Sequence, residues 1–190
     1  MISNLWKKSN IVTFMGIAFS IVGVCLCFLG NIKYAIVMLM LGGICDGFDG
    51  PIARRINKEA NPYDIQIDSL ADIVGSGVLP VCICLAIGYK SPIDMAIYVF
   101  FIICGITRLS YYNVNCSDKD SFSGMPITSS TMLLPWMYVL CNNEIAFMIG
   151  LTLLSIAFVS GLKVKKPSMK VKVALSIGGA ILGIAILFLI

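Results

Sequence analysis

Seven apolar stretches separated by short polar connections cover almost the whole chain and limit the folds open to it. We place them at 10–30, 33–54, 67–88, 92–113, 126–142, 144–162 and 172–190. A helix of about 20 apolar residues can cross a hydrocarbon core of about 30 Å. Of the 190 residues, 58% are hydrophobic and only 13% are charged, which is unusual for a soluble domain. The pattern predicts an all-α membrane protein, a bundle of six to seven transmembrane helices. The seventh stretch is short and could instead lie on the membrane surface.

The polar connections leave no room for a separate soluble domain, so one membrane domain over residues 1–190 is expected. In this interpretation residues 1–9 are an interfacial segment, because their apolar side chains can enter the headgroup region while their lysines meet lipid phosphates. Residues 10–162 are the core helices. Residues 163–190 are a basic loop and an extra C-terminal helix.

The basic residues are distributed unevenly between the two predicted sides of the membrane. Alternating the connections puts all but two of the 14 lysines and arginines on one side, and only Lys33 and Lys90 on the other. The positive-inside rule then predicts a multi-pass protein of the cell membrane with a cytoplasmic N-terminus. The excess basic residues are assigned to topology and to contact with membrane lipids, and no nucleic-acid partner is expected.

The carboxylates gather on the predicted cytoplasmic side. Six of the ten acidic residues lie between residues 45 and 77. Asp46 and Asp49 are three residues apart, and Asp68 and Asp72 are four apart, so each pair shares one face of a helix. The second stretch descends to this side and the third rises from it, which predicts that the four meet in a cytoplasm-facing active site.

Such a cluster needs a counter-charge, since four close carboxylates near hydrocarbon repel one another and lose hydration. Hard oxygen ligands suit a divalent cation, Mg²⁺ or Mn²⁺, with Ca²⁺ as a possible occupant. The alternative is that the aspartates only solvate helix ends. The chain contains no histidine, so proton transfer falls to a carboxylate, lysine, tyrosine or metal-bound water. Aspartates, metal and nearby arginines together favour phosphoryl transfer.

The acidic stretch also carries a family resemblance. The segment D-G-F-D-G-P-I-A-R at 46–54, followed by D-S-L-A-D at 68–72, resembles the signature of the CDP-alcohol phosphotransferases, D-x-x-D-G-x-x-A-R and D-x-x-x-D. Segments 77–80, 108–113 and 122–126 are similar to the integral-membrane phosphatidylserine synthases of that family, and the resemblance covers residues 9 to 160. The spacer before Asp68 is one residue longer than in the family, and Asp64 stands where a glycine is expected.

The resemblance implies a role for each matching residue, with Asp72 also the base that takes the hydroxyl proton. The implied metal ligands are Asp46, Asp49, Asp68 and Asp72. The implied contacts to a CDP-diacylglycerol-type lipid are Asn10, Thr13, Gly50, Ala53 and Arg54. An amino-acid substrate calls for a bidentate arginine and acceptors. The candidates for binding L-serine are Arg108, Asn113, Gln66 and Arg55.

The expected function is therefore a transferase of the CDP-diacylglycerol–serine O-phosphatidyltransferase type. It would move a phosphatidyl or archaetidyl group from a CDP-linked lipid to the hydroxyl of L-serine and release CMP. Transfer to glycerol 3-phosphate or an inositol phosphate is the first alternative, although it would demand more basic residues. A cation transporter is a more distant one, because transporter sites lie near the midplane on broken, repeated helices. Small-xxx-small pairs at Gly43 and Gly47 and at Gly179 and Gly183 suggest helix packing and a homodimer.

Overall fold

The computed structural model of this chain describes residues 8–56, 62–114, 121–141, 143–165 and 169–188. Within these ranges, side chains are not described at 8–10, 49–56, 121–123, 163–165, 169, 170 and 172. The predicted interfacial segment therefore falls largely outside the described residues, and Lys8 and Ser9 begin the first helix.

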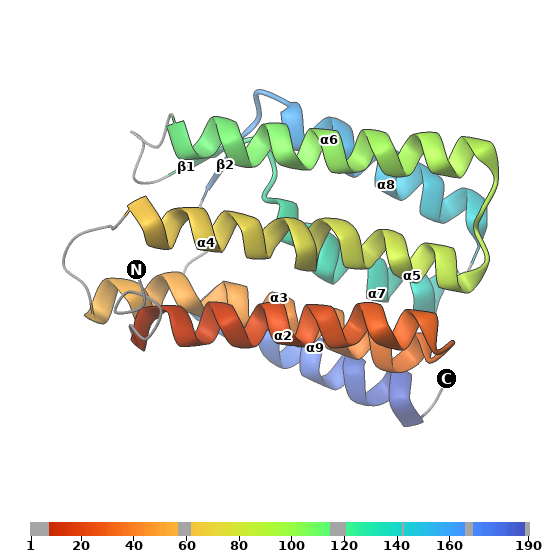
Figure 1. The fold of residues 1–190 in the computed structure, drawn as a ribbon, viewed down its shortest axis with the longest axis horizontal. Helices are drawn as coiled ribbons and strands as arrows, with labels where there is room; N and C mark the ends of the chain where they lie inside the picture. The colour runs from red at the N-terminus through yellow and green to blue at the C-terminus, as the bar shows by residue number, and fades with distance from the viewer. Residues whose placement is uncertain (1–7, 57–61, 115–120, 142, 166–168, 189–190) are drawn as a thin grey trace.

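The fold is a helical bundle, as the apolar stretches predict (Figure 1). Its helices are α2 (Lys8–Phe28), α3 (Ile32–Ile56), α4 (Pro62–Asp72), α5 (Leu79–Ile87), α6 (Pro92–Val114), α7 (Ser130–Leu140), α8 (Glu144–Val159) and α9 (Met169–Phe188). A π-helical turn, η1 (Ile73–Val78), joins α4 to α5 without a break, and a 3-10 turn, η2 (Ile127–Ser129), precedes α7. Every predicted stretch thus corresponds to one continuous helical segment.

Helix length and hydropathy agree with a membrane setting. In the part of the chain that the structure describes, three segments are long and apolar enough to cross a membrane, namely Ile11–Phe28, Pro62–Ile87 and Pro92–Val114. Shorter apolar helices are Ile127–Leu140, Glu144–Val159 and Val173–Phe188. The start of α2 and the end of α9 lie at opposite ends of the bundle, and α9 runs along it rather than across one end (Figure 1). This arrangement fits a seventh crossing better than a surface helix.

Local sequence signals mark the helix ends opposite the start of α2. Gly88, with φ of 116°, ends α5 in the left-handed conformation, and its N–H donates to the carbonyls of Cys84 and Leu85. Ser91 and Asp94 cap α6 reciprocally: the Ser91 N–H donates to Asp94 Oδ2 at 2.7 Å, and the Asp94 N–H donates to Ser91 Oγ at 3.2 Å. Asn143 Oδ1 accepts from the N–H of Ile145 at the start of α8.

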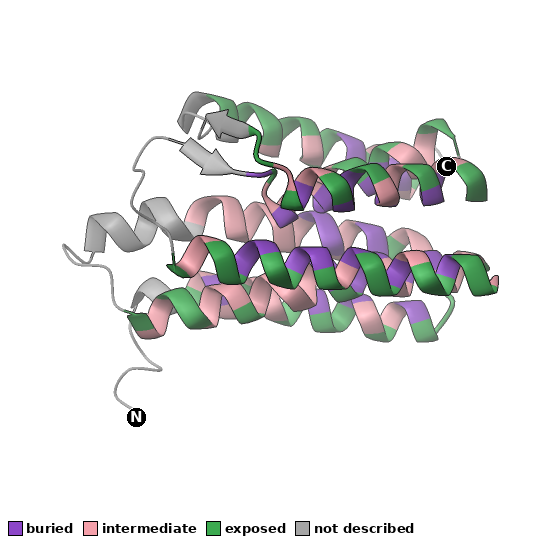
Figure 2. Ribbon diagram, turned by 90° about the horizontal axis from the view of Figure 1, so that it is seen from above, coloured by how far each residue is buried: buried purple, intermediate pink, exposed green. Residues whose placement is uncertain are grey.

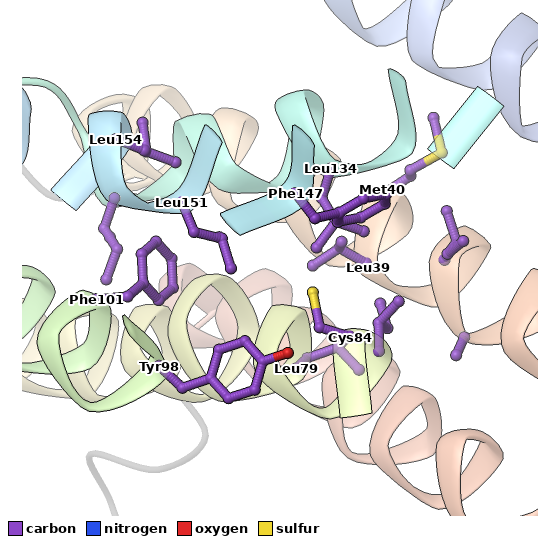
Figure 3. Close-up of a cluster of buried hydrophobic side chains, with 14 of the residues drawn as sticks. Leu39, Met40, Leu79, Cys84, Tyr98, Phe101, Leu134, Phe147, Leu151 and Leu154 are labelled. Atoms are coloured by element: carbon purple, nitrogen blue, oxygen red, sulfur yellow. The ribbon is translucent and has the colours of Figure 1, made fainter. Parts of the chain in front are cut away.

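The core lies along the axis of the bundle, and apolar side chains also cover its outside. Leu39, Leu79, Phe101 and Phe147 are buried at the meeting of α3, α5, α6 and α8 (Figure 3). Outward faces stay exposed (Figure 2) although they are apolar, as at Phe28, which is 85% exposed. In a bundle of this kind lipid, rather than water, covers such a surface.

A two-stranded antiparallel sheet was not predicted from the sequence. Strands β1 (Ser121–Ser123) and β2 (Lys163–Lys165) pair with Phe122 opposite Val164. The pairing continues into two further backbone hydrogen bonds, from Gly124 to the carbonyl of Leu162 and from Met125 to that of Ala157. Gly124 has φ of 76° and lies against the Phe158 carbonyl, where a Cβ would overlap that oxygen. The sheet therefore joins two connections and directs the chain back toward η2.

Three of the four glycines in the small-xxx-small pairs pack against neighbouring helices, whereas a Cβ at Gly47 would meet no described atom within 4 Å. Gly43 faces Thr131 of α7, while Gly179 and Gly183 of α9 face Met40 of α3, each with an ideal Cβ position 3.8 Å from that side chain. The predicted close helix packing is confirmed at these glycines. The homodimer stays a prediction, and these pairs no longer argue for it.

Candidate active site

Two antiparallel helices carry the aspartates to one end of the bundle. Asp46 lies on α3, and Asp68 and Asp72 lie one turn apart on α4. One carboxylate oxygen from each of the three residues lies within 4.8 Å of the others. All three residues are half-buried, and the end of α3 and the start of α4 lie on the same side of the bundle as the start of α2 (Figure 1). The sequence-predicted convergence of the two helices is thus present for these three carboxylates, which we call the aspartate cluster.

Several predicted site residues have backbones in these helices but side chains outside the described part of the structure. Asp49 follows Asp46 by one turn of α3, and Asn10 precedes Thr13 by one turn of α2. The others lie in the last turns of α3: Gly50, Ala53, Arg54 and Arg55. Their roles stay predictions.

A narrow cavity of about 20 Å³ extends from the aspartate cluster into the bundle, enough for about one water molecule. Small residues line it, and Thr13 of α2, which is 9% exposed, is among them. Packing around it is tight, since a Cβ on Gly75 would lie 2.7 Å from Ser20 Oγ. The predicted lipid-binding residue Thr13 is therefore next to the carboxylates.

Arg108 brings a positive charge to the same place from α6. It is 6% exposed, and its guanidinium carbon lies 5.1 Å from the centre of the Tyr112 ring. It interacts electrostatically with Asp72 and Asp46. Among the predicted serine-binding residues with described side chains, Arg108 is the one that reaches the aspartate cluster.

Asn113 and Gln66 have different settings. Asn113 Nδ2 donates to Ser69 Oγ at 2.8 Å, and Ser69 Oγ donates to the carbonyl of Ile65 at 3.0 Å. Asn113 thus ties the end of α6 to α4. Gln66 is exposed and lies about 200° around the helix from Asp68, so it faces away from the cluster.

The donor set fits a divalent cation. Carboxylate oxygens from two helices, held within reach of a single ion, are hard ligands that suit Mg²⁺, Mn²⁺ or Ca²⁺. Packing three negative charges this closely in a half-buried site is costly unless positive charge is nearby, and Arg108 contributes a single charge. A cation at the cluster together with an arginine would bind a diphosphate.

The family comparison agrees with this geometry. Residues 6–177 match the family model described as CDP-alcohol phosphatidyltransferase. The chain belongs to the CDP-alcohol phosphatidyltransferase family.

Three similar relatives have serine in their names. The chain is 34% identical over 142 residues to the CDP-diacylglycerol–serine O-phosphatidyltransferase of Bacillus subtilis, which covers 74% of this chain and 78% of the relative. It is 35% identical over 125 residues to the enzyme of the same name from Saccharomyces cerevisiae, covering 61% and 45%. It is 26% identical over 113 residues to the archaetidylserine synthase of Methanothermobacter thermautotrophicus, covering 58% and 48%. The chain therefore spans about half the length of the yeast and archaeal relatives.

The sequence reasoning missed three polar residues beside the family's aspartates. Ser76 follows Asp72 by four residues in η1, and Ser130 and Thr131 begin α7, which contacts both η1 and α3. One signal was available. Pro80 lies inside a predicted helix and has no N–H, so the carbonyl of Ser76 loses its ordinary α-helical donor. Which distant residue replaces that donor was not visible in the sequence.

Proposed function

We propose that this chain transfers a phosphatidyl or archaetidyl group from a CDP-linked lipid to the hydroxyl of L-serine, and that it releases CMP. The observation that carries the proposal is the convergence of Asp46, Asp68 and Asp72 in a chain of this family. Serine as acceptor is supported by the three relatives, whose names share it. The names differ in the lipid, so both kinds of tail stay within the proposal.

In this proposal the aspartate cluster, extended by Asp49, holds Mg²⁺ or Mn²⁺, and Ca²⁺ could occupy the same ligands. When bound, the cation neutralises the diphosphate and stabilises the charge on departing CMP. Arg54, one or two turns further along α3, would neutralise phosphate. Asn10 and Thr13 would contact the nucleotide, and Gly50 and Ala53 would leave room for cytidine.

The reaction exchanges a phosphoanhydride bond for a phosphate ester bond. The serine hydroxyl oxygen bonds to the lipid-bearing phosphorus, and the bond from that phosphorus to the bridging oxygen breaks. The bridging oxygen keeps the electron pair and leaves with CMP. Asp72 would take the hydroxyl proton as the base. Positioning and charge neutralisation supply most of the rate in such transfers.

Arg108 is the proposed ligand for the serine carboxylate. A guanidinium can bind a carboxylate through two parallel hydrogen bonds, which orients it as well as attracts it. Arg108 is nearly buried and interacts electrostatically with Asp72, the proposed base. Serine bound there would place its hydroxyl near the aspartate that receives the proton. Asn113, Gln66 and Arg55 remain secondary candidates.

The orientation and assembly of the chain are part of the proposal. The start of α2, with Lys8, and the end of α3, with Arg54 and Arg55, lie on the same side of the bundle as the aspartate cluster (Figure 1), which favours a cytoplasmic active site. We also propose a homodimer in the cell membrane, to be tested by native mass spectrometry of the protein extracted with its lipids.

The test is a choice of acceptor by the purified full chain in vesicles containing CDP-diacylglycerol. With Mn²⁺ or Mg²⁺, labelled serine should enter the lipid fraction as CMP is released, and labelled glycerol 3-phosphate or inositol phosphate should not. Incorporation of a phosphorylated acceptor instead of serine would favour the first alternative. Ion flux through vesicles, without any CMP release, would favour the transporter.

A further inference from the structure

The first turn of α7 contacts α3, which carries Asp46, and η1, the turn that continues directly from α4. Ser130 is 1% exposed, and its hydroxyl donates to the carbonyl of Ser76 in η1 at 2.6 Å, across 54 positions of sequence. Thr131, 5% exposed, lies against Gly43 of α3, where an added Cβ would overlap its side chain. Ser130 and Thr131 therefore contact, from one side, the two helical segments that form the site, namely η1 after α4 and α3.

Each contact lies one turn from an aspartate. Gly43 precedes Asp46 by three residues, and Ser76 follows Asp72 by four. The orientation of Thr131 is fixed by a second hydrogen bond, from its hydroxyl to the carbonyl of Thr128 at 2.7 Å. A shift of α7 would thus move α3 and η1 relative to each other near the carboxylates.

The contact at Ser76 occurs at a weak point of the helix. The π-helical turn η1 begins directly after Asp72, and Pro80 cannot supply the N–H that a regular α-helix would offer to the Ser76 carbonyl. A π-helical turn also rotates the residues before it relative to those after it. The orientation of Asp68 and Asp72 around their helix therefore depends on what holds this turn in place.

We propose that Ser130 is a positioning residue for the aspartate cluster. Its hydrogen bond to the Ser76 carbonyl fixes the position of η1 relative to α7. Thr131 packs against Gly43 and fixes the position of α3 relative to the same helix. Together they set the separation across which Asp46 faces Asp68 and Asp72. In its use of a cation the inference rests on the proposed function, but it concerns the affinity of the site and not the identity of the acceptor.

The experiment measures metal affinity in four forms of the full chain in detergent: the wild type, Ser130→Ala, Ser130→Cys and Ser155→Ala. Ser130→Ala removes the donor. Ser155→Ala is the matched control, because Ser155 is 0% exposed and its hydroxyl donates at 2.6 Å to the carbonyl of Leu151 within its own helix. Mn²⁺ titrations, followed by electron paramagnetic resonance and by thermal unfolding, give the midpoint for each form with and without CDP-diacylglycerol.

Ser130→Ala should raise the Mn²⁺ midpoint about tenfold, the size of effect found for residues that orient metal ligands. Ser155→Ala should leave the midpoint within about twofold. Ser130→Cys, which keeps a weak donor of similar size, should fall between Ser130→Ala and the wild type, and it replaces Ser130→Ala if that variant does not fold. In acceptor assays the KM for serine should not change with Ser130→Ala.

The inference is overturned if Ser130→Ala and Ser155→Ala lower the unfolding temperature alike while both keep the wild-type Mn²⁺ midpoint. It is overturned as well if the wild type binds no Mn²⁺. Should Mn²⁺ bind with the expected differences while no serine is transferred, the positioning role stands and the proposed acceptor fails.

Discussion

At the scale of the residue, the site is defined by charged side chains in half-buried or buried positions, where a charge costs free energy. Asp46, Asp68 and Asp72 are half-buried and within reach of one another, and Arg108 is almost fully buried beside them. Ionisable groups in a membrane bundle are costly and usually serve function. Their spacing in the sequence was enough to group the aspartates, because a turn of helix has a fixed length. Arg108 was predicted for the site, but its contact with Tyr112 was not.

Asp68→Asn should lower transfer activity by about 100-fold or more, comparable with the loss of a group that stabilises transition-state charge. The amide has the shape of the carboxylate but no negative charge, so it lowers the affinity of the site for the cation. Activity is measured as CMP release at saturating serine. Asp64→Asn is the control, since Asp64 lies one turn earlier on α4 and outside the aspartate cluster. Equal losses in both variants would contradict a specific role for Asp68.

Arg108→Lys should raise the KM for serine about tenfold or more, with a smaller change in the KM for the CDP-linked lipid. Lysine keeps the charge but loses the planar fork that binds a carboxylate through two hydrogen bonds. Steady-state kinetics with each substrate varied in turn makes the distinction. A rise in the KM for the lipid alone would assign Arg108 to phosphate binding instead.

At the scale of the element, the segment α4–η1–α5 combines two requirements in one helix. Its first part presents Asp68 and Asp72, and its last part buries Leu79 and Ile83 in the apolar core. The π-helical turn between them changes which face of the helix points inward. Gly75, within that turn, allows α2 to approach at Ser20.

Gly75→Ala should destabilise the protein by about 1–3 kcal/mol, the usual cost of overpacking. The new Cβ would lie 2.7 Å from Ser20 Oγ but 3.7 Å from Ser20 Cβ. Adding Ser20→Ala should therefore recover most of the loss in thermal unfolding temperature. Gly178→Ala in α9 is the control, because its Cβ would meet no described atom within 4 Å. A double variant no more stable than Gly75→Ala would show that the two residues do not clash.

The sequence predicted the positions of the helices, but it did not predict the π-helical turn or the pair of β-strands. Apolar length located every helical segment, because membrane spans must be long and apolar whatever they pack against. The turn at Ile73–Val78 and the β1–β2 pair depend on contacts between distant residues, such as Ser130 with Ser76 and Gly124 with Phe158. Spacing along the chain cannot reveal such contacts. The same limit left the partner of Gly43 unknown, although the sequence marked it as a packing site.

At the scale of the whole molecule, the bundle separates a polar end from an apolar body. The aspartate cluster and the start of α2 share one end, and the end of α9 lies at the other (Figure 1). A lipid substrate could then keep its tails beside the exposed apolar faces while its diphosphate reaches the carboxylates. The proposed cytoplasmic orientation follows from the uneven distribution of basic residues along the sequence.

Orientation can be tested with a native thiol. Cys141 follows α7, is exposed and lies at the end away from the aspartate cluster. A maleimide that cannot cross membranes should label it in intact cells that carry Cys25→Ser, because Cys25 is also exposed, and adding Cys141→Ser should remove that labelling. Labelling of Cys141 only after permeabilisation would reverse the proposed topology.

The most direct test of the central claim is anomalous diffraction from crystals of the full chain grown with Mn²⁺. The account predicts one or two Mn²⁺ peaks among the carboxylates of Asp46, Asp68 and Asp72, and their loss in crystals of Asp68→Asn. Mn²⁺ peaks only elsewhere, or carboxylates turned away from one another in the crystal, would contradict a cation site shared by α3 and α4.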